Sequence, residues 1–164
     1  MLKNICGRHI KSNVCGTSVR KRVISIEISL FAHATEAPEK IERAFQNLLP
    51  SNRVEEVVLR KRTLKGEYGN PIIYYKAKIT KPEITEAVLR KIGHNLSQYE
   101  KELLDRELKR RLEKGSLYLR LDKQAAYLGK YKLCNADPIH LRIRFRTSKI
   151  DSIRDICKEL GMLP

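Results

Sequence analysis

The sequence has 164 residues, the size of one domain, and its 34 lysines and arginines against 19 aspartates and glutamates give a formal net charge of +15 at pH 7. This charge indicates an anionic partner, and a content of 41% hydrophobic residues excludes a disordered polycation. No apolar run reaches the roughly 20 residues that span a bilayer, and the first residues lack the apolar middle of a signal peptide. We therefore expect a soluble, cytoplasmic protein.

Residues 1–22 carry cations and no acidic residue, since the first carboxylate of the chain is Glu27. The cations are Lys3, Arg8, Lys11, Arg20, Lys21 and Arg22. Polar, glycine-containing stretches of this kind bury too little surface to order themselves. We expect residues 1–22 to form a basic arm that is flexible without a partner, and residues 23–164 to form a single domain. A disordered leader, or a start codon assigned too far upstream, is the alternative explanation of the arm.

The folded part begins with a strand and a helix. Apolar and polar residues alternate between Ile24 and Leu30, which is the period of a strand with one buried face. Thr35 offers an N-cap hydroxyl, and apolar residues then recur at helical spacing over residues 36–49, until Pro50 stops the helix.

A hairpin and a second helix follow. Residues 54–65 and 72–80 are predicted strands, because residues 66–71 between them are rich in glycine, asparagine and proline. Pro82 then opens a helix that we expect to be interrupted near Gly93.

A third helix begins at the capping box that Ser97 forms with Glu100 and ends at Gly115. Its expected apolar stripe consists of Tyr99, Leu103, Leu108 and Leu112. Alternation predicts a strand over residues 117–121, and residues 122–128 follow as a helical turn.

The last elements are a short strand at residues 131–133, a strand at residues 139–146, and a helix that Ser148 and Asp151 cap and Gly161 ends. The helices are too sparse for regular βαβ units. The sequence therefore predicts an α+β fold: a two-layer sandwich in which helices cover one face of a largely antiparallel, mixed sheet.

The strand at residues 139–146 has a cationic face. Its apolar residues claim one side, so His140, Arg142, Arg144 and Arg146 share the other. Alternate residues lie about 6.5 to 7 Å apart along a strand, which is comparable with the spacing of phosphates along a nucleic acid. Arginine binds phosphate bidentately, so this face is a candidate nucleic-acid surface. The alternative is a solvated sheet face.

A second basic cluster lies on the hairpin and consists of Arg60, Lys61, Arg62 and Lys65. Tyr68, Tyr74 and Tyr75 are close to it in sequence, a combination that suits a phosphate backbone and an unstacked base. Tyrosines in hairpins are also common cross-strand packing residues, so both interpretations stay open.

Metal and catalytic motifs are weak. The cysteines Cys6, Cys15, Cys134 and Cys157 are too scattered for a disulfide framework, and we expect them to be reduced. The spacing of Cys6, His9 and Cys15 is irregular for a zinc site, so we expect neither a metal nor a cofactor. No nucleophile or phosphate-loop motif is present, and a nuclease would require at least two of His33, Glu36, Asp122 and His140 to converge in a pocket.

Three segments resemble an archaeal family of predicted RNA-binding proteins, also described as predicted exosome subunits. They are residues 26–36, the turn at residues 66–72, and the run LYLRLDKQAAYLG at residues 117–129. The resemblance covers roughly Val23 to Leu160 and implies a fold like that of the large-subunit ribosomal protein that binds the small rRNA, with RNA as the ligand. The chain departs from the family pattern at Glu67 and Tyr68, where histidines often stand.

We therefore expect a non-catalytic protein that binds structured RNA, either rRNA or an RNA-processing substrate, with a possible exosome link and no membrane partner. The expected RNA-binding residues are Arg142, Arg144, Arg146, Arg60, Lys61, Arg62, Lys65, Arg120, Lys123, Arg20, Lys21 and Arg22. The alternatives are a ribosomal or ribosome-associated protein, an RNA-processing nuclease, and a scaffold whose basic face docks an acidic protein.

Overall fold

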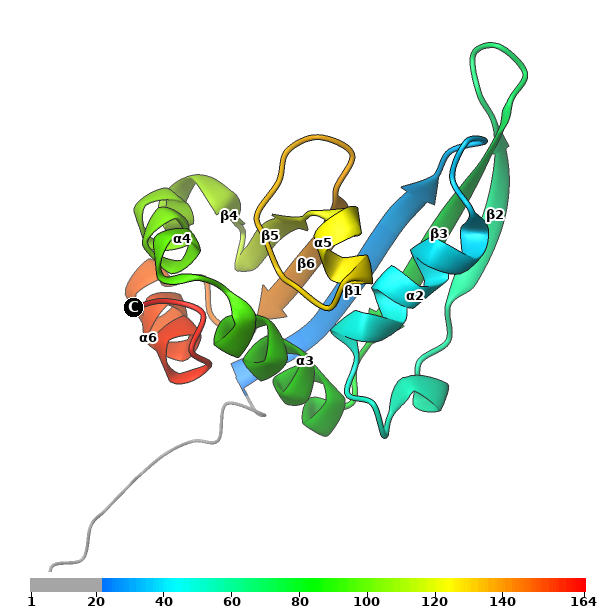
Figure 1. Cartoon of the computed structure of the whole chain (residues 1–164). Coiled ribbons are helices and arrows are strands. Elements are labelled where there is room, and N and C mark those ends of the chain that lie inside the picture. Colours follow the sequence, from blue (N-terminus) through cyan, green and yellow to red (C-terminus); the bar gives the residue numbers. More distant parts are fainter. Residues whose placement is uncertain (1–21) are drawn as a thin grey trace, which may run out of the picture.

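The computed structural model of the chain describes residues 22–164 (Figure 1). The strands are β1 (Val23–Ala32), β2 (Arg60–Lys65), β3 (Pro71–Ile79), β4 (Leu112–Glu113), β5 (Ser116–Leu121) and β6 (Ile139–Phe145). The helices are α2 (Pro38–Leu48), α3 (Pro82–Asn95), α4 (Gln98–Arg111), α5 (Lys123–Tyr127) and α6 (Ile150–Glu159), with a 3₁₀ turn at Val54–Glu56.

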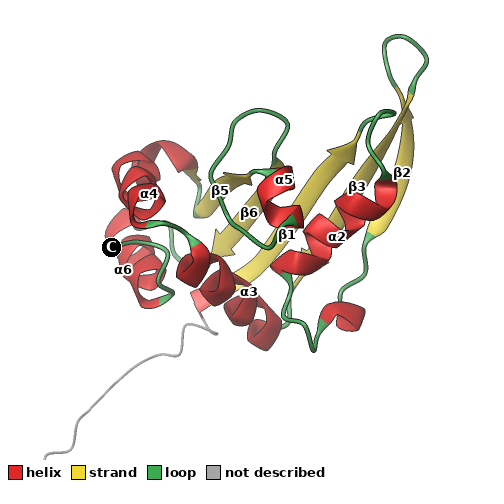
Figure 2. Ribbon diagram, in the orientation of Figure 1, coloured by secondary structure: helices red, strands yellow, loops and turns green. Residues whose placement is uncertain are grey.

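The strands form one open sheet in the order β2-β3-β1-β6-β5-β4, with the α-helices on one side of it (Figure 2). The predicted α+β two-layer sandwich is confirmed. The sheet is not mixed, however, because every pair of neighbouring strands in the described part of the chain is antiparallel. No helix among residues 22–164 is long and apolar enough to cross a bilayer.

The core lies between the sheet and the helices. Ile26, Ile28 and Leu30 of the central strand β1 are fully buried, and they lie in register with buried residues of β3 and β6. Because side chains alternate along a strand, the residues between them lie on the opposite side. Among the residues that the structure describes, no helix lies on that side, which we call the open face (Figure 2).

Four predictions of local structure are wrong. The third predicted helix, α4, ends at Arg111 rather than at Gly115, because Leu112 and Glu113 pair with β5 as strand β4. Residues 54–56 form a 3₁₀ turn rather than the start of a strand, and Glu56 is ion-paired there with Arg53 and Lys81. Helix α3 continues without interruption through Gly93 to Asn95. The glycine is accommodated within the helix because the backbone of the segment after α6 packs directly against it, where a side chain would not fit. The predicted strand at residues 131–133 is only a single bridge between Leu133 and Leu121.

The capping predictions have a mixed outcome. The capping box of Ser97 and Glu100 is present. Thr35 does not cap α2, which begins after Ala37 with Pro38 in its first turn, and α6 begins after Lys149 without a side-chain cap. Proline presets the first helical φ angle, so α2 starts without a capping hydroxyl.

The buried stripe of α4 also differs from the prediction. Leu104 and Leu108 are fully buried, whereas Tyr99 is 67% exposed and Leu103 only half-buried. Leu103 and Leu104 are adjacent and equally apolar, so the sequence allows two rotations of the helix about its axis, one that buries Leu103 and one that buries Leu104. Packing against the sheet and α6 selects the second.

Among the described cysteines, Cys134 and Cys157 are free thiols. Cys157 is buried in α6, and burial raises the pKa of its thiol to about 12, so it remains protonated as an apolar core residue. The candidate metal ligands Cys6, His9 and Cys15 lie outside the described residues.

Candidate nucleic-acid interface

All three arginines of the predicted row are exposed: Arg142 and Arg144 lie on the open face, and Arg146 follows the end of β6, next to Arg22. Arg142 is flanked by Glu27 of β1 and by Tyr118 of β5, and Arg144 by serines on both neighbouring strands. His140 lies beside Arg120. Within residues 22–164, no ion pair involves Arg142, Arg144 or Arg146.

The other strands extend this cationic surface. By register, the strand cations of the open face are Arg60, Arg62, Lys76, Lys78, Arg120, Arg142 and Arg144. The strand carboxylates on the same face are Glu27 and Glu113. Glu27 is ion-paired with Lys76, at 3.3 Å between the ammonium nitrogen and a carboxylate oxygen. The open face therefore has a large excess of positive charge.

The hairpin cluster divides between the two faces. Arg62 lies in register with Tyr74 on the open face, whereas Lys61 lies in register with the fully buried Tyr75 on the helix side. There the ammonium of Lys61 is ion-paired with Glu42 and lies 5.6 Å from the ring centre of Tyr75. Because side chains alternate along the strand, Arg60 lies with Arg62 on the open face. Lys65 lies with Lys61 on the helix side.

The candidates of the arm are only partly described. Arg22 belongs to the folded body: its guanidinium is ion-paired with Glu159 of α6, and its carbonyl accepts a hydrogen bond from the Arg146 amide. Arg20 and Lys21 lie outside the described residues.

Lys123 lies in a partly buried ion cluster. Its side chain is 5% exposed, and its ammonium donates to the Phe31 carbonyl at 2.9 Å, to Glu36 at 3.0 Å and to Asp137 at 2.5 Å. Asp137 reaches this position from a left-handed backbone conformation, with φ of 45°. The three donations use all the protons of the ammonium, so we leave Lys123 out of the proposed surface.

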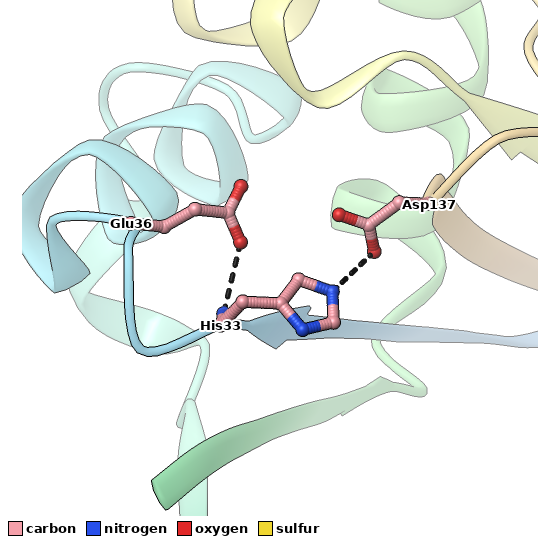
Figure 3. A group of neighbouring side chains, drawn as sticks. All are labelled: His33, Glu36 and Asp137. Carbon is pink, nitrogen blue, oxygen red and sulfur yellow. Dashed lines mark hydrogen bonds and ion pairs between the residues drawn. The ribbon is translucent and has the colours of Figure 1, made fainter. Parts of the chain in front are cut away.

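Two of the nuclease candidates meet in this cluster. His33, Glu36 and Asp137 converge (Figure 3), with the His33 ring nitrogen 3.2 Å from Asp137 and the His33 amide donating to Glu36 at 2.9 Å. Both carboxylates are held by the ammonium of Lys123, which supplies the positive charge that a metal ion would otherwise bring.

The other two nuclease candidates lie elsewhere. Asp122 caps α5 by accepting a hydrogen bond from the Ala125 amide at 2.7 Å. His140 lies on the open face, in register with Arg120. Of the four residues, His33 and Glu36 therefore converge, in a cluster whose two carboxylates are already ion-paired with Lys123.

Aromatic side chains line a hollow of about 370 Å³ on the open face. On one side, the rings of Phe31 and Tyr74 lie 5.0 Å apart between centres. On the other side, the ring centre of Tyr118 lies 5.9 Å from the guanidinium of Arg142. Sequence reasoning missed Phe31 and Lys76 as members of this surface, although alternation along their strands places them opposite the buried residues.

The fold and this face define an α+β sandwich protein with one uncovered, cationic and aromatic sheet surface. Over residues 25–145 the chain matches the family model described as RNA binding. It is 34% identical over 125 residues to RNA-binding protein PAB1135 of Pyrococcus abyssi, covering 74% of this chain and 81% of that protein. The chain belongs to this RNA-binding family.

Two solved structures have a similar fold. The crystal structure of protein SSO0741 from Sulfolobus solfataricus superposes with a TM-score of 0.68 at 26% identity, covering 84% of this chain and 97% of that one. A UPF0201 protein from Methanococcus jannaschii has a TM-score of 0.52 at 16% identity, covering 86% of this chain and all of that one, and shares the fold alone.

Proposed function

We propose that this protein binds structured RNA without catalysis, and that the phosphate backbone lies across the open face. The observation that carries the proposal is that Arg142 and Arg144 of the open face, and Arg146 just beyond β6, form no ion pair within residues 22–164. Like charges in adjacent alternate positions repel one another, so an unpaired row is costly unless an anion binds it.

The dimensions of the sheet support phosphate binding. Alternate residues of one strand lie about 6.5 to 7 Å apart, and neighbouring strands about 4.8 Å apart, so the open face presents a grid of cations. Each phosphate that such a grid neutralises releases counterions, which provides affinity without a base-specific contact. The cations of the basic arm would add to this affinity.

The triple variant Arg142→Gln, Arg144→Gln, Arg146→Gln tests the proposal. We expect weaker RNA binding and a log-log salt slope shallower by about two to three units, because each lost cation removes roughly one counterion-releasing contact. Fluorescence anisotropy with labelled structured RNA from 50 to 300 mM KCl measures both quantities.

A matched control removes the same charge from the helix side. Arg106, Lys109 and Lys158 are exposed on α4 and α6, and changing all three to glutamine should leave most of the salt slope in place. An unchanged slope in the strand variant, or an equal loss in the helix variant, would contradict the assignment of the open face.

The identity of the RNA is a separate question within the proposal. The sequence resemblance favours rRNA or an exosome substrate, and crosslinking in cells with sequencing of the bound RNA distinguishes the two. Cosedimentation with ribosomal subunits that survives high salt would favour a ribosome-associated protein over a free RNA-processing adaptor. Labelled RNA incubated with the protein and Mg²⁺ should stay intact, and cleavage would contradict a non-catalytic role.

The pH dependence of RNA binding tests the role of His140. Burial and the nearby Arg120 lower the pKa of His140, and Asp137 opposes them, so the ring is neutral at pH 7. Acidification through this lowered pKa adds a cation to the open face. We expect RNA affinity to rise by about two- to fivefold as the pH falls through this lowered pKa, the effect of one exposed ion pair.

The variant His140→Gln should lose this pH-dependent rise, whereas His94→Gln on α3 should keep it. The measurement is the dissociation constant at fixed ionic strength, with the same RNA for all three proteins. Identical pH profiles for the wild type and His140→Gln would show that His140 does not face the RNA.

A further inference from the structure

We propose that the aromatic hollow of the open face binds unpaired bases, so that the ligand is an RNA loop or single-stranded segment rather than an uninterrupted duplex. This inference rests on the proposed function and specifies the class of RNA that it uses. The hollow is lined by Phe31 and Tyr74 at one end, Tyr118 at the other, and Ser29 and His140 between them.

The aromatic rings are placed for stacking. Tyr118 is 38% exposed, and Phe31 and Tyr74 are half-buried on the side of the sheet that no helix covers. By register, Tyr118 is two strands and four residues away from Phe31, a separation of about 16 Å. Sheets that read single-stranded RNA through aromatic residues stack two or three bases, which this separation accommodates.

The polar groups of the hollow can also bind base edges. Glu27 lines it, and beside its ion pair with Lys76 its carboxylate can accept a hydrogen bond from a base amino group. The Ser29 hydroxyl and the neutral His140 ring can each donate and accept. The arginine row runs past the same hollow, and Arg142 is both a member of the row and part of the lining of the hollow.

This arrangement selects among RNA structures. In a duplex the base faces are covered by their neighbours in the stack, so aromatic side chains cannot reach them. Unpaired bases can be splayed out onto a sheet while the phosphates on either side reach Arg142 and Arg144. A surface that only neutralised phosphates would not distinguish the two forms.

The test compares two blunt-ended RNA duplexes of equal length and equal phosphate number, each annealed from two strands so that neither contains a loop. One is fully paired, and the other has three successive mismatched pairs with 2-aminopurine at the central position. We expect the wild type to bind the mismatched RNA at least tenfold more tightly and to quench its 2-aminopurine fluorescence on binding.

The variants Tyr118→Leu and Phe31→Leu should each lower affinity for the mismatched RNA about tenfold, reduce the quenching and leave the salt slope unchanged. Tyr99→Leu is the matched control, because Tyr99 is 67% exposed on α4, away from the open face. Thermal unfolding of each variant shows whether the fold is retained, and Tyr118, the more exposed of the two rings, provides the result if Phe31→Leu unfolds.

Equal affinity of the wild type for both RNAs, or unchanged discrimination in Tyr118→Leu, would overturn this inference. Neither result would contradict the proposed function, which is tested separately by the salt slope of the arginine triple variant with either RNA.

Discussion

Replacing Lys123 by methionine should lower the free energy of unfolding by about 3 kcal/mol. Methionine keeps the length and apolar character of the side chain but leaves the Phe31 carbonyl, Glu36 and Asp137 without the ammonium that they share. Removing one partner of a buried ion pair costs about 3–5 kcal/mol, and the lower end applies because water reaches Asp137, which is 43% exposed. Equilibrium urea denaturation measures the change.

Two further variants separate charge from packing. Lys109→Met removes an exposed lysine from α4 and should change stability by less than about 0.5 kcal/mol. The triple variant Lys123→Met, Glu36→Gln, Asp137→Asn removes the orphaned charges and should recover part of the loss. A loss below about 1 kcal/mol in Lys123→Met would show that the cluster does not stabilise the fold.

The pH dependence of stability provides a second readout of the same cluster. Burial raises the pKa of Asp137, but the hydrogen bonds from Lys123 and His33 outweigh it, and the net pKa lies below the ordinary range. The stabilisation is therefore fully present above that range and is lost as the pH falls through the lowered pKa. In Lys123→Met this acid-dependent part should shrink.

The variant Gly93→Ala should destabilise the protein by about 2 kcal/mol or more, although alanine is the better helix former by about 1 kcal/mol. A Cβ atom at Gly93 would lie 2.5 Å from the Leu160 carbonyl oxygen and 2.9 Å from the Met162 amide nitrogen. Both are backbone atoms of the segment after α6, so the helix or that segment must move.

Thermal and urea unfolding check this prediction, with Lys109→Ala on the exposed side of α4 as a helix-propensity control. A rise in the melting temperature of Gly93→Ala would mean that α3 and the C-terminal segment do not meet at this glycine. The buried Met162 and Leu163, which continue the segment, should lose part of their packing in the variant.

Local patterns predicted most of the elements because they involve neighbours in the chain. The alternation over residues 139–146 placed Arg142 and Arg144 opposite the core, and the spacing of Ser97 and Glu100 predicted the capping box. The same patterns failed where a distant contact decided the structure. Gly93 looked like a helix breaker, but it is the point at which α3 admits the backbone near Leu160.

The candidate site shows the same division. Alternation separates Lys61 from Arg62, but only the register with Tyr75 and Tyr74 assigns Lys61 to Glu42 on the helix side and Arg62 to the open face. Lys123 is among the cations that the sequence suggests as RNA contacts. Its partners Phe31 and Glu36 are 92 and 87 residues away in the sequence, so no local pattern could reveal the ion cluster.

By itself, the sequence determined the fold class, the cationic face of the strand at residues 139–146 and the expectation of an RNA partner, because periodicity and charge are properties of the chain. Only the tertiary structure decided which cations share a surface and which are neutralised inside, and it alone brought Phe31, Tyr74 and Tyr118 around one hollow. The physical reason is that strand pairing joins residues far apart in the chain, and the register of that pairing depends on how the whole core packs.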